Sequence, residues 1–149
     1  MAEPTTVDAV AILPLPEDRL LLSEIFRQSS WQLDMAESLG DGRVLLNDPR
    51  KGVVLTGCHL PDGGWRDVLH EVERRPIHVP PVIVVSRVAD ERLWAEVLNL
   101  RGYDVLATPF HADEVRWAIQ AAWRHWLDDS RLRARGAYTS TSAVGTSPH

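Results

Sequence analysis

The stretch Gly52-Val-Val-Leu-Thr-Gly-Cys-His-Leu-Pro-Asp-Gly-Gly-Trp65 decides the fold of this chain. Its β-branched and apolar run, Val53-Val-Leu55, ends abruptly at Gly57, and turn-forming residues then lead into an amphipathic segment. A short apolar run bounded by turn signals is typical of a buried strand, especially of a parallel strand covered on both faces. The stretch therefore predicts the central strand of an α/β sheet and the loop where such folds keep their chemistry.

Further strands and helices are predicted on both sides of this stretch. Short apolar runs predict strands at Val7–Leu13, Trp31–Ala36, Pro81–Ser86 and Tyr103–Ala107. Apolar residues at helical spacing predict helices at Pro16–Gln28, Trp65–Arg75, Asp90–Gly102 and Ala112–Arg133. The segment Glu37–Asn47 contains Gly40 and Gly42 and predicts only a short or irregular helix. This alternation predicts a doubly wound α/β fold whose five-stranded parallel sheet has the flavodoxin-like strand order 2-1-3-4-5.

The length and net charge of the chain exclude some classes of protein. The chain has 149 residues, enough for one domain with a core, and a formal charge of −5, whereas nucleic-acid-binding modules usually carry a basic face. Its single cysteine, Cys58, excludes an intrachain disulfide. The sequence has no membrane-length apolar run and no signal-peptide pattern at its start. We therefore expect a cytoplasmic protein that binds neither nucleic acid nor membrane.

The domain boundaries follow from where the predicted elements begin and end. We expect an N-terminal tail at residues 1–6, one domain at residues 7–128, and a C-terminal helix extension with a disordered tail at residues 129–149. The residues after Gly136 are rich in Ser and Thr and poor in apolar side chains. Such a composition is typical of disorder because it buries too little apolar surface to offset the entropy of folding.

The ends of the predicted strands define a crevice at one edge of the sheet. In this strand order the crevice lies at the carboxyl ends of the strands, which are Leu13-Pro14, Gly57, Ser86 and Thr108. None of these residues is a carboxylate, histidine, lysine or arginine. Hard cations need oxygen ligands, and acid–base catalysis needs a titratable group. We therefore expect no metal, no cofactor and no enzymatic activity at this crevice.

Four segments of the chain resemble the receiver domain of bacterial response regulators, the CheY-like family. They are Pro16-Glu-Asp-Arg-Leu-Leu-Leu22, Val53-Val-Leu-Thr-Gly-Cys-His-Leu-Pro-Asp-Gly63, Pro81-Val-Ile-Val-Val-Ser86 and Tyr103-Asp-Val-Leu-Ala-Thr-Pro-Phe110. The Leu-Pro-Asp-Gly loop and the Pro-Phe pair together are the most specific part, and the resemblance covers about Val7 to Leu127. It implies two-component (phosphorelay) signal transduction as the context and a cis peptide bond before Pro109.

The resemblance also implies which residues hold the positions of the family's phosphorylation site. In receivers, an aspartate accepts a phosphoryl group from a histidine kinase, an acidic pair holds Mg²⁺, and a hydroxyl and a lysine bind the phosphoryl oxygens. The corresponding residues here are Gly57 for the acceptor, Leu13 and Pro14 for the acidic pair, Ser86 for the hydroxyl, Thr108 for the lysine and Val105 for the aromatic switch. Only Ser86 keeps its polar group. The chain is thus expected to be a pseudo-receiver that neither binds Mg²⁺ nor becomes phosphorylated.

Other residues near the crevice have ordinary explanations. Glu17 and Asp18 fit the first turn of a helix, and Asp62 fits a turn. Cys58 and His59 are adjacent and would point to opposite faces of a strand, which disfavours a nucleophile–base pair. A second hypothesis is that the emptied crevice binds a small ligand, so that the protein is a sensor or adaptor.

Three tryptophans suggest a surface for a protein partner. Trp94, Trp117 and Trp123 lie on the fourth and fifth predicted helices, at least partly off the apolar stripes. In the receiver family, the face formed by these helices and the fifth strand is the usual dimer or partner surface. Exposed aromatic residues there would anchor a signalling protein or a second copy of the chain. The alternative is that these side chains are half-buried and shield the sheet.

Overall fold

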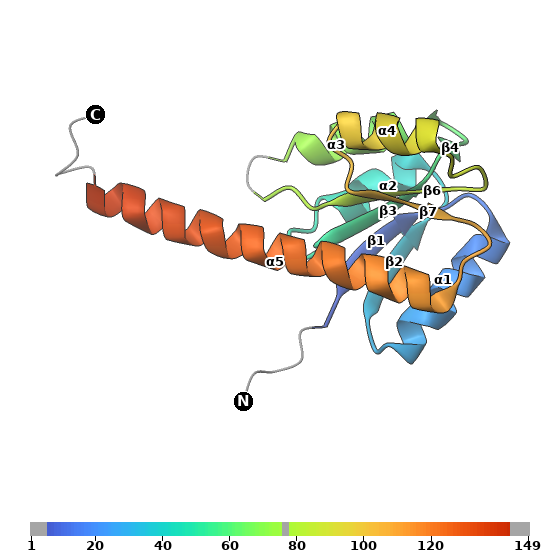
Figure 1. Cartoon of the computed structure of the whole chain (residues 1–149), viewed down its shortest axis with the longest axis horizontal. Helices are drawn as coiled ribbons and strands as arrows, with labels where there is room; N and C mark the ends of the chain where they lie inside the picture. Colours follow the sequence, from blue (N-terminus) through green and yellow to red (C-terminus); the bar gives the residue numbers. More distant parts are fainter. Residues whose placement is uncertain (1–5, 76–77, 144–149) are drawn as a thin grey trace.

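The computed structural model describes residues 6–75 and 78–143, and of residues 133–143 the backbone alone. Five parallel strands form one sheet in the order β2-β1-β3-β6-β7 (Figure 1). They are β1 (Asp8–Ile12), β2 (Gln32–Ala36), β3 (Val53–Gly57), β6 (Val82–Ser86) and β7 (Asp104–Ala107). The predicted order 2-1-3-4-5 is therefore confirmed, because β6 and β7 are the fourth and fifth strands of this sheet.

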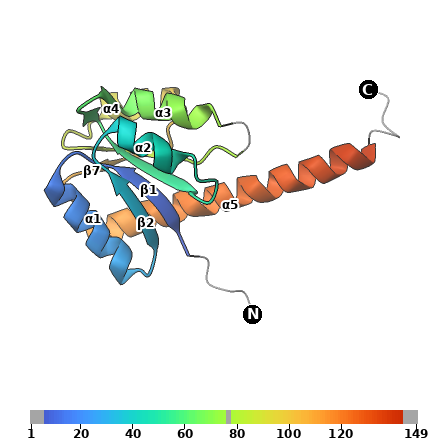
Figure 2. The same ribbon diagram turned by 180° about the vertical axis from the view of Figure 1, so that it is seen from behind.

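Helices cover both faces of the sheet (Figures 1 and 2). The helices α1 (Pro16–Gln28) and α5 (Ala112–Ala143) pack on the face that includes Leu55 and Ile83. The other face, which includes Val54 and Val84, is covered by α2 (Leu39–Leu46), α3 (Trp65–Glu73) and α4 (Glu91–Asn99). Alternate residues of each central strand thus enter two separate apolar cores, which accounts for their continuous apolar sequence.

The loop after β3 contains a small hairpin that the sequence pattern did not indicate. Its strands are β4 (His59–Leu60) and β5 (Gly63–Gly64), which pair antiparallel. Asp62 in the turn accepts hydrogen bonds from the backbone N–H groups of Leu39 (2.8 Å) and Gly40 (2.9 Å), at the start of α2. These donors have no partner within the helix, so Asp62 caps α2 and holds the loop after β3 against the start of α2.

The helix α2 is short, with eight residues, as one of the two predicted alternatives had it, and it is regular. Its two glycines do not break it, and Gly42 has a packing role. A Cβ atom at Gly42 would overlap the side chain of Ile12 on β1. The missing side chain therefore lets α2 approach the sheet closely, a tertiary effect that outweighs the low helix propensity of glycine.

The tryptophan pair on α5 packs against the start of β3. Trp123 and Trp126 lie 4.9 Å apart between ring centroids, and a Cβ atom at Gly52 would come within 2.5 Å of both rings. Trp123 is only 8% exposed. The expectation that Trp123 belongs to an exposed partner surface is therefore wrong, because Gly52 leaves room for its ring against the backbone.

The last helix is longer than predicted. It continues from Ala112 to Ala143 and projects beyond the sheet (Figure 1), whereas the pattern predicted an end near Arg133 and a disordered segment after Gly136. One glycine costs a helix only about 1 kcal/mol, and proline, the strong breaker, does not occur between Ala112 and Ala143. The remainder of the predicted tail, residues 144–149, and the first five residues lie outside the described residues.

Candidate functional site

A crevice opens at the carboxyl edge of the sheet, where the topology predicted it. Its volume is about 510 Å³. The residues at the predicted strand ends all line it: Leu13, Pro14, Gly57, Ser86 and Thr108. The sequence analysis thus identified residues that the fold brings together from four different strands.

Gly57 and Pro14 face each other across the floor of this crevice. A Cβ atom on Gly57 would lie 3.1 Å from Cδ of Pro14 and 3.7 Å from the carbonyl oxygen of His59. The φ angle of Gly57 is not positive, so its backbone conformation is open to other residues. The restriction on this position is therefore steric, and it comes from the ring of Pro14.

The remaining strand-end residues engage the protein itself. The side chain of Leu13 is 1% exposed and belongs to the core under α1 and α5, while its carbonyl oxygen accepts a hydrogen bond from Arg19 Nη1 (2.7 Å). Ser86 Oγ accepts a hydrogen bond from the backbone N–H of Val88 (3.1 Å). The same Oγ atom lies 3.3 Å from the carbonyl oxygen of Val88. The peptide bond between Thr108 and Pro109 is cis, as predicted.

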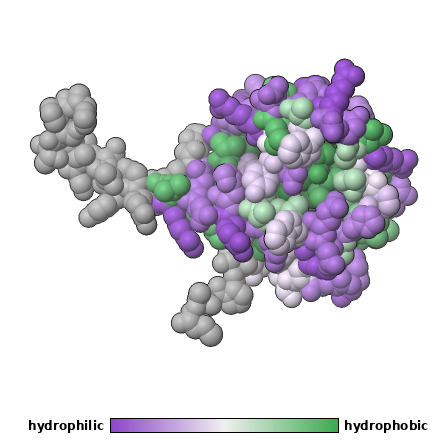
Figure 3. Space-filling model, in the orientation of Figure 1, coloured by the Kyte–Doolittle hydropathy of each residue, from purple (hydrophilic) through white to green (hydrophobic). Residues whose placement is uncertain are grey.

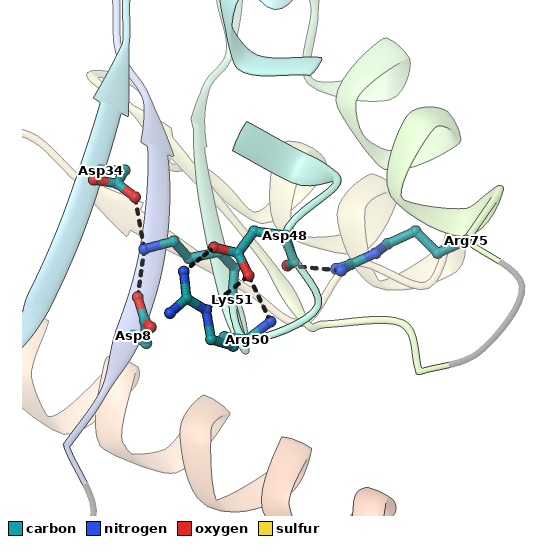
Figure 4. Close-up of polar contacts among 6 residues, drawn as sticks. All are labelled: Asp8, Asp34, Asp48, Arg50, Lys51 and Arg75. Atoms are coloured by element: carbon teal, nitrogen blue, oxygen red, sulfur yellow. Dashed lines mark hydrogen bonds and ion pairs between the residues drawn. The ribbon is translucent and has the colours of Figure 1, made fainter. Parts of the chain in front are cut away.

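Lys51, the single lysine of the chain, lies at the opposite end of the sheet (Figure 4). It is 5% exposed and its ammonium group forms ion pairs with Asp8 and with Asp34, the latter at 2.8 Å. Burial lowers the pKa of Lys51, but hydrogen bonds to Asp34 and Asp8 outweigh burial, so the pKa is raised. Lys51 therefore stabilises the amino-terminal edge of the sheet and contributes no charge to the crevice.

Charged side chains from helices and from the loop after β6 also border the crevice, and the positions of the strand ends did not predict them. Asp18, Arg87, Asp90, Arg92 and Glu96 all contribute to its lining. Helices that follow strands in a doubly wound fold begin at this edge, so the first-turn position of Asp18 and the position of Arg87 directly after β6 were the available signals. Sequence periodicity assigned Asp18 only an ordinary role at the helix start.

Most of these charges have a partner or a capping role. Arg87 lies 3.8 Å from Glu17 of α1, and Asp90 caps α4 by accepting a hydrogen bond from the N–H of Leu93 (2.9 Å). Glu96 forms an ion pair with Arg66. Asp18 and Arg92 differ, because no hydrogen bond or ion pair to either side chain is found within the described residues. Burial and the charge of Glu17 raise the pKa of Asp18, although Arg87 acts in the opposite direction.

The thiol and imidazole in the loop after β3 do not form a catalytic pair. Burial raises the pKa of Cys58, although a hydrogen bond with Ser86 opposes the shift. A thiol with a raised pKa is a weak nucleophile at neutral pH. His59 is exposed. The arrangement favours an inert thiol over nucleophilic chemistry.

The residues at the crevice do not fit the Mg²⁺ site of receiver domains. Leu13 and Pro14 offer no side-chain oxygen, and Gly57 has no side chain. Of the lining carboxylates, Asp90 caps α4 and Glu96 pairs with Arg66, which leaves Asp18 alone. In the described part of the chain, no group of three or more His, Cys, Asp or Glu side chains is arranged to hold a metal ion. Mg²⁺ needs several oxygen ligands in octahedral geometry, so we derive no chemistry through a metal here.

The face formed by α4, β7 and α5 carries exposed apolar and aromatic side chains (Figure 3). Trp117 is 77% exposed and Trp94 is 49% exposed, and Leu98 and Leu100 are also exposed on or beside α4. Trp94 Nε1 lies 3.4 Å from Oδ1 of Asp104 on β7. Of the three tryptophans predicted for this surface, two are accessible, and Trp94 and Trp117 define what we call the α4–β7–α5 surface. None of the helices in the described regions is long and apolar enough to cross a membrane.

Comparison with solved structures shows which known proteins have a similar fold. No family model and no curated protein matches the sequence. Among solved structures, the signal receiver domain of an HD domain-containing protein from Pseudomonas fluorescens Pf-5 matches with a TM-score of 0.77 at 18% identity, over 88% of this chain and 97% of that one. The receiver domain of a sensor histidine kinase from Pseudomonas aeruginosa PAO1, solved with magnesium in its active-site cleft, matches with a TM-score of 0.70 at 16% identity. That match covers 80% of this chain and 98% of the other.

A third similar structure is a dimer. The beryllofluoride-activated NtrC4 receiver domain matches with a TM-score of 0.72 at 16% identity, over 80% of this chain and 98% of that one. All three structures are receiver domains that are matched over nearly their full length. The five-stranded sheet, its strand order and its flanking helices therefore give this chain the fold of a response-regulator receiver domain.

Proposed function

We propose that this chain is a receiver-like signalling domain that acts through protein–protein contacts and without phosphorylation of its crevice. Its place would be in two-component-type signal transduction, since the similar structures include the receiver domain of a sensor histidine kinase. We also propose that it has no enzymatic activity of its own, since a phosphoryl transfer needs an acceptor and a metal or cationic group to stabilise the charge that develops.

The pairing of Gly57 with Pro14 is the observation that carries this proposal. An aspartyl phosphate needs a carboxylate at the end of the central strand, and the residue there has no side chain. The ring of Pro14 occupies the space beside it, and Lys51 is buried at the other end of the sheet in ion pairs with Asp8 and Asp34. The loss of one group could be compensated by another, but acceptor, acidic pair and lysine are all absent from the crevice.

The α4–β7–α5 surface supports contact with a protein partner. Trp94 and Trp117 are large, rigid side chains exposed on neighbouring helices, and aromatic residues of this kind are enriched among the residues that dominate binding energy at interfaces. The NtrC4 receiver domain is a dimer in its activated form. A second copy of this chain is therefore the first partner to test, and a different signalling protein is the alternative.

The absence of phosphorylation can be tested directly. The protein is incubated with Mg²⁺ and acetyl phosphate, and separately with Mg²⁺ and beryllofluoride, beside a receiver domain that has an aspartate acceptor. We expect intact mass spectrometry and amide NMR spectra to show no covalent adduct and no Mg²⁺-dependent shift at Gly57 or Ser86. A stoichiometric adduct, or saturable Mg²⁺-dependent shifts at these residues, would overturn the proposal.

The partner surface is tested by removing its aromatic side chains. The double variant Trp94→Ala/Trp117→Ala is compared with the parent protein by sedimentation equilibrium over a wide concentration range. If a second copy is the partner, we expect the dimer to weaken at least about tenfold, since hot-spot truncations cost about 2 kcal/mol or more. Val44→Ala is the control, because Val44 is exposed on α2, away from this surface. A parent protein that stays monomeric excludes the second copy as the partner.

A further inference from the structure

The residues around the crevice do not fill it. The side chain of Leu13 is buried in the core under α1 and α5, and Leu15 lines the cavity but is 36% exposed. The open volume of about 510 Å³ lies within the range of roughly 300–1,000 Å³ that small-molecule sites occupy. The crevice is therefore large enough for a small organic molecule.

The walls of the crevice are mainly apolar. Pro14 lies against Gly57, and Val85 and Leu93 come from β6 and α4. Sites for small organic molecules have mainly apolar walls with a few polar groups that fix the orientation of the ligand. An occupant would therefore place an apolar body on these surfaces, because apolar contact is what they offer.

The charged side chains at the crevice favour neither a cation nor an anion. They are of both signs: Asp18, Arg87, Asp90, Arg92 and Glu96. A ligand ammonium group beside Asp18 would also meet Arg87, whose charge already acts favourably on that carboxylate. A ligand carboxylate beside Arg92 would also meet Glu96, which lies one turn further along α4 on the same helix face. Either charge would meet attraction and repulsion together, and it would lose hydration between apolar walls.

Thr108 supplies an uncharged polar group to the crevice. Its backbone N–H donates a hydrogen bond to the carbonyl oxygen of Ser86 (3.0 Å), which fixes its position at the end of β7. Within the described residues, Thr108 Oγ1 makes no hydrogen bond, whereas the hydroxyl of Ser86 is engaged by the backbone of Val88. A hydroxyl both donates and accepts, so Thr108 offers a hydrogen bond to an alcohol or a carbonyl group.

We propose that this crevice binds a small uncharged molecule that has an apolar body and one hydroxyl or carbonyl group. The body would lie against Pro14, Val85 and Leu93, and the polar group would form a hydrogen bond with Thr108 Oγ1. The lining includes neither Trp94 nor Trp117. The site is therefore separate from the α4–β7–α5 surface, and it requires neither a protein partner nor a place in two-component signalling.

The test uses hexanol as the probe, with hexanoate and hexylammonium as charged ligands of the same chain length. Each is titrated at neutral pH into the ¹⁵N-labelled protein while the amide signals of Gly57, Ser86 and Thr108 are followed. We expect saturable shifts with hexanol and affinities at least about fivefold weaker for both charged ligands, because their head groups lose hydration. A charged ligand that binds as tightly as hexanol, or no saturable shift with hexanol, would overturn the proposal.

A series of alcohols tests the apolar body. From butanol to hexanol, each added methylene should tighten binding by up to about fourfold, as expected for its transfer out of water. The amides of Trp94 and Trp117, on the exposed surface, should show no saturation with the same ligands. Affinity that is independent of chain length, or equal affinity at the two places, would contradict a specific apolar site.

Two variants test the hydrogen bond with Thr108. Thr108→Val replaces the hydroxyl by a methyl group of similar shape and should weaken hexanol binding about fivefold, as expected for one neutral hydrogen bond. Thr6→Val makes the same change at an exposed position before β1, at the opposite edge of the sheet, and should leave the affinity unchanged. Unchanged affinity in Thr108→Val, or equal losses in the two variants, would show that Thr108 is not the recognition group.

Discussion

The Cδ atom of Pro14 lies 3.1 Å from the position that a Cβ atom on Gly57 would occupy. In the proposed correspondence with receiver domains, Pro14 holds a position of the acidic pair and Gly57 the position of the phosphoacceptor. The ring of Pro14 would be in tight contact with the first atom of any side chain at Gly57. The two positions are therefore sterically coupled, and a side chain added at Gly57 requires Pro14 to move.

Gly57→Asp should not make the protein phosphorylatable. The new Cβ would require Pro14 to move by a few tenths of an ångström, and the new carboxylate would find neither a metal site nor a lysine nearby. We expect no mass increase with acetyl phosphate and Mg²⁺. We also expect a loss of about 1 kcal/mol in the free energy of unfolding, from crowding and from the partly desolvated charge. Intact mass spectrometry and urea unfolding measure the two outcomes.

The steric part of this prediction has its own control. Pro14→Ala removes the ring that faces Gly57, so Gly57→Asp should cost less in that background. For two residues in contact, we expect the double-mutant cycle to give a coupling of about 0.5 kcal/mol or more. Strictly additive effects would contradict the steric relationship.

The position of the crevice was predictable because it depends on topology alone. Once the chain alternates strands and helices, the carboxyl ends of the strands must share one edge, and Gly57, Ser86 and Thr108 fall there by counting along the sequence. Their lack of charge was equally visible. Asp18 was harder to assign, because a first-turn acid is explained adequately by the helix dipole, and only the packed structure shows which way it faces.

Trp123 marks a different limit of sequence reasoning. On the helical repeat of α5 it lies at the edge of the apolar stripe that runs through Val115, Ile119 and Trp126, so periodicity leaves its exposure open. What buries it is the missing side chain of Gly52, a residue far away in the sequence. The hairpin formed by β4 and β5 was missed for a similar reason, because two-residue strands carry no periodic signal.

Lys51→Met should destabilise the protein although it removes no catalytic group. The ammonium group is buried and pairs with Asp8 and Asp34, which would be left without their cation. We expect a loss of about 2 kcal/mol, below the full cost of breaking a buried pair, because Asp34 is half-exposed. Arg50→Met is the matched control, since Arg50 is exposed and solvent screens its ion pair with Asp48, so the change should affect stability much less. Equal losses measured by urea unfolding would contradict this assignment.

The same lysine predicts a loss of stability at alkaline pH. Its pKa is raised above 10.5 in the folded protein, so its contribution is complete below the unfolded pKa and is lost as the pH rises through the folded one. The stability difference between the parent protein and Lys51→Met should therefore shrink above about pH 10.5. Burial also raises the pKa of Cys58 and Tyr103, so these groups change the stability at alkaline pH in both proteins. The difference between the parent protein and Lys51→Met isolates the contribution of Lys51. A difference that stays constant would show that the charge of Lys51 contributes nothing.

Gly52→Ala should be strongly destabilising, unlike a comparable change on α2. The added methyl group would meet the rings of Trp123 and Trp126 at 2.5 Å, where the backbone of β3 leaves it no room. We expect a loss of about 1–3 kcal/mol, typical of overpacking. Gly40→Ala is the control, because its Cβ would lie 3.4 Å from Oδ2 of Asp62 and better helix propensity should make it neutral or stabilising. Thermal unfolding followed by tryptophan fluorescence measures both, and equal effects would contradict the packing of the two rings on Gly52.

Asp62 should make the stability of the protein depend on acid pH. Backbone hydrogen bonds from Gly40 and Leu39 lower the pKa of its carboxyl below 3.8. A lowered pKa means that the contribution is complete above the unfolded value and is lost as the pH falls through the folded one. Asp62→Ala should therefore be less stable than the parent protein at pH 7, and the difference should shrink below about pH 4. Asp62→Asn keeps one acceptor oxygen, so its stability at neutral pH should lie between those of the parent protein and Asp62→Ala. Urea unfolding at a series of pH values measures the stability difference, and ¹³C NMR titration measures the pKa of the Asp62 carboxyl. A pKa at or above 3.8 would contradict the capping role of Asp62.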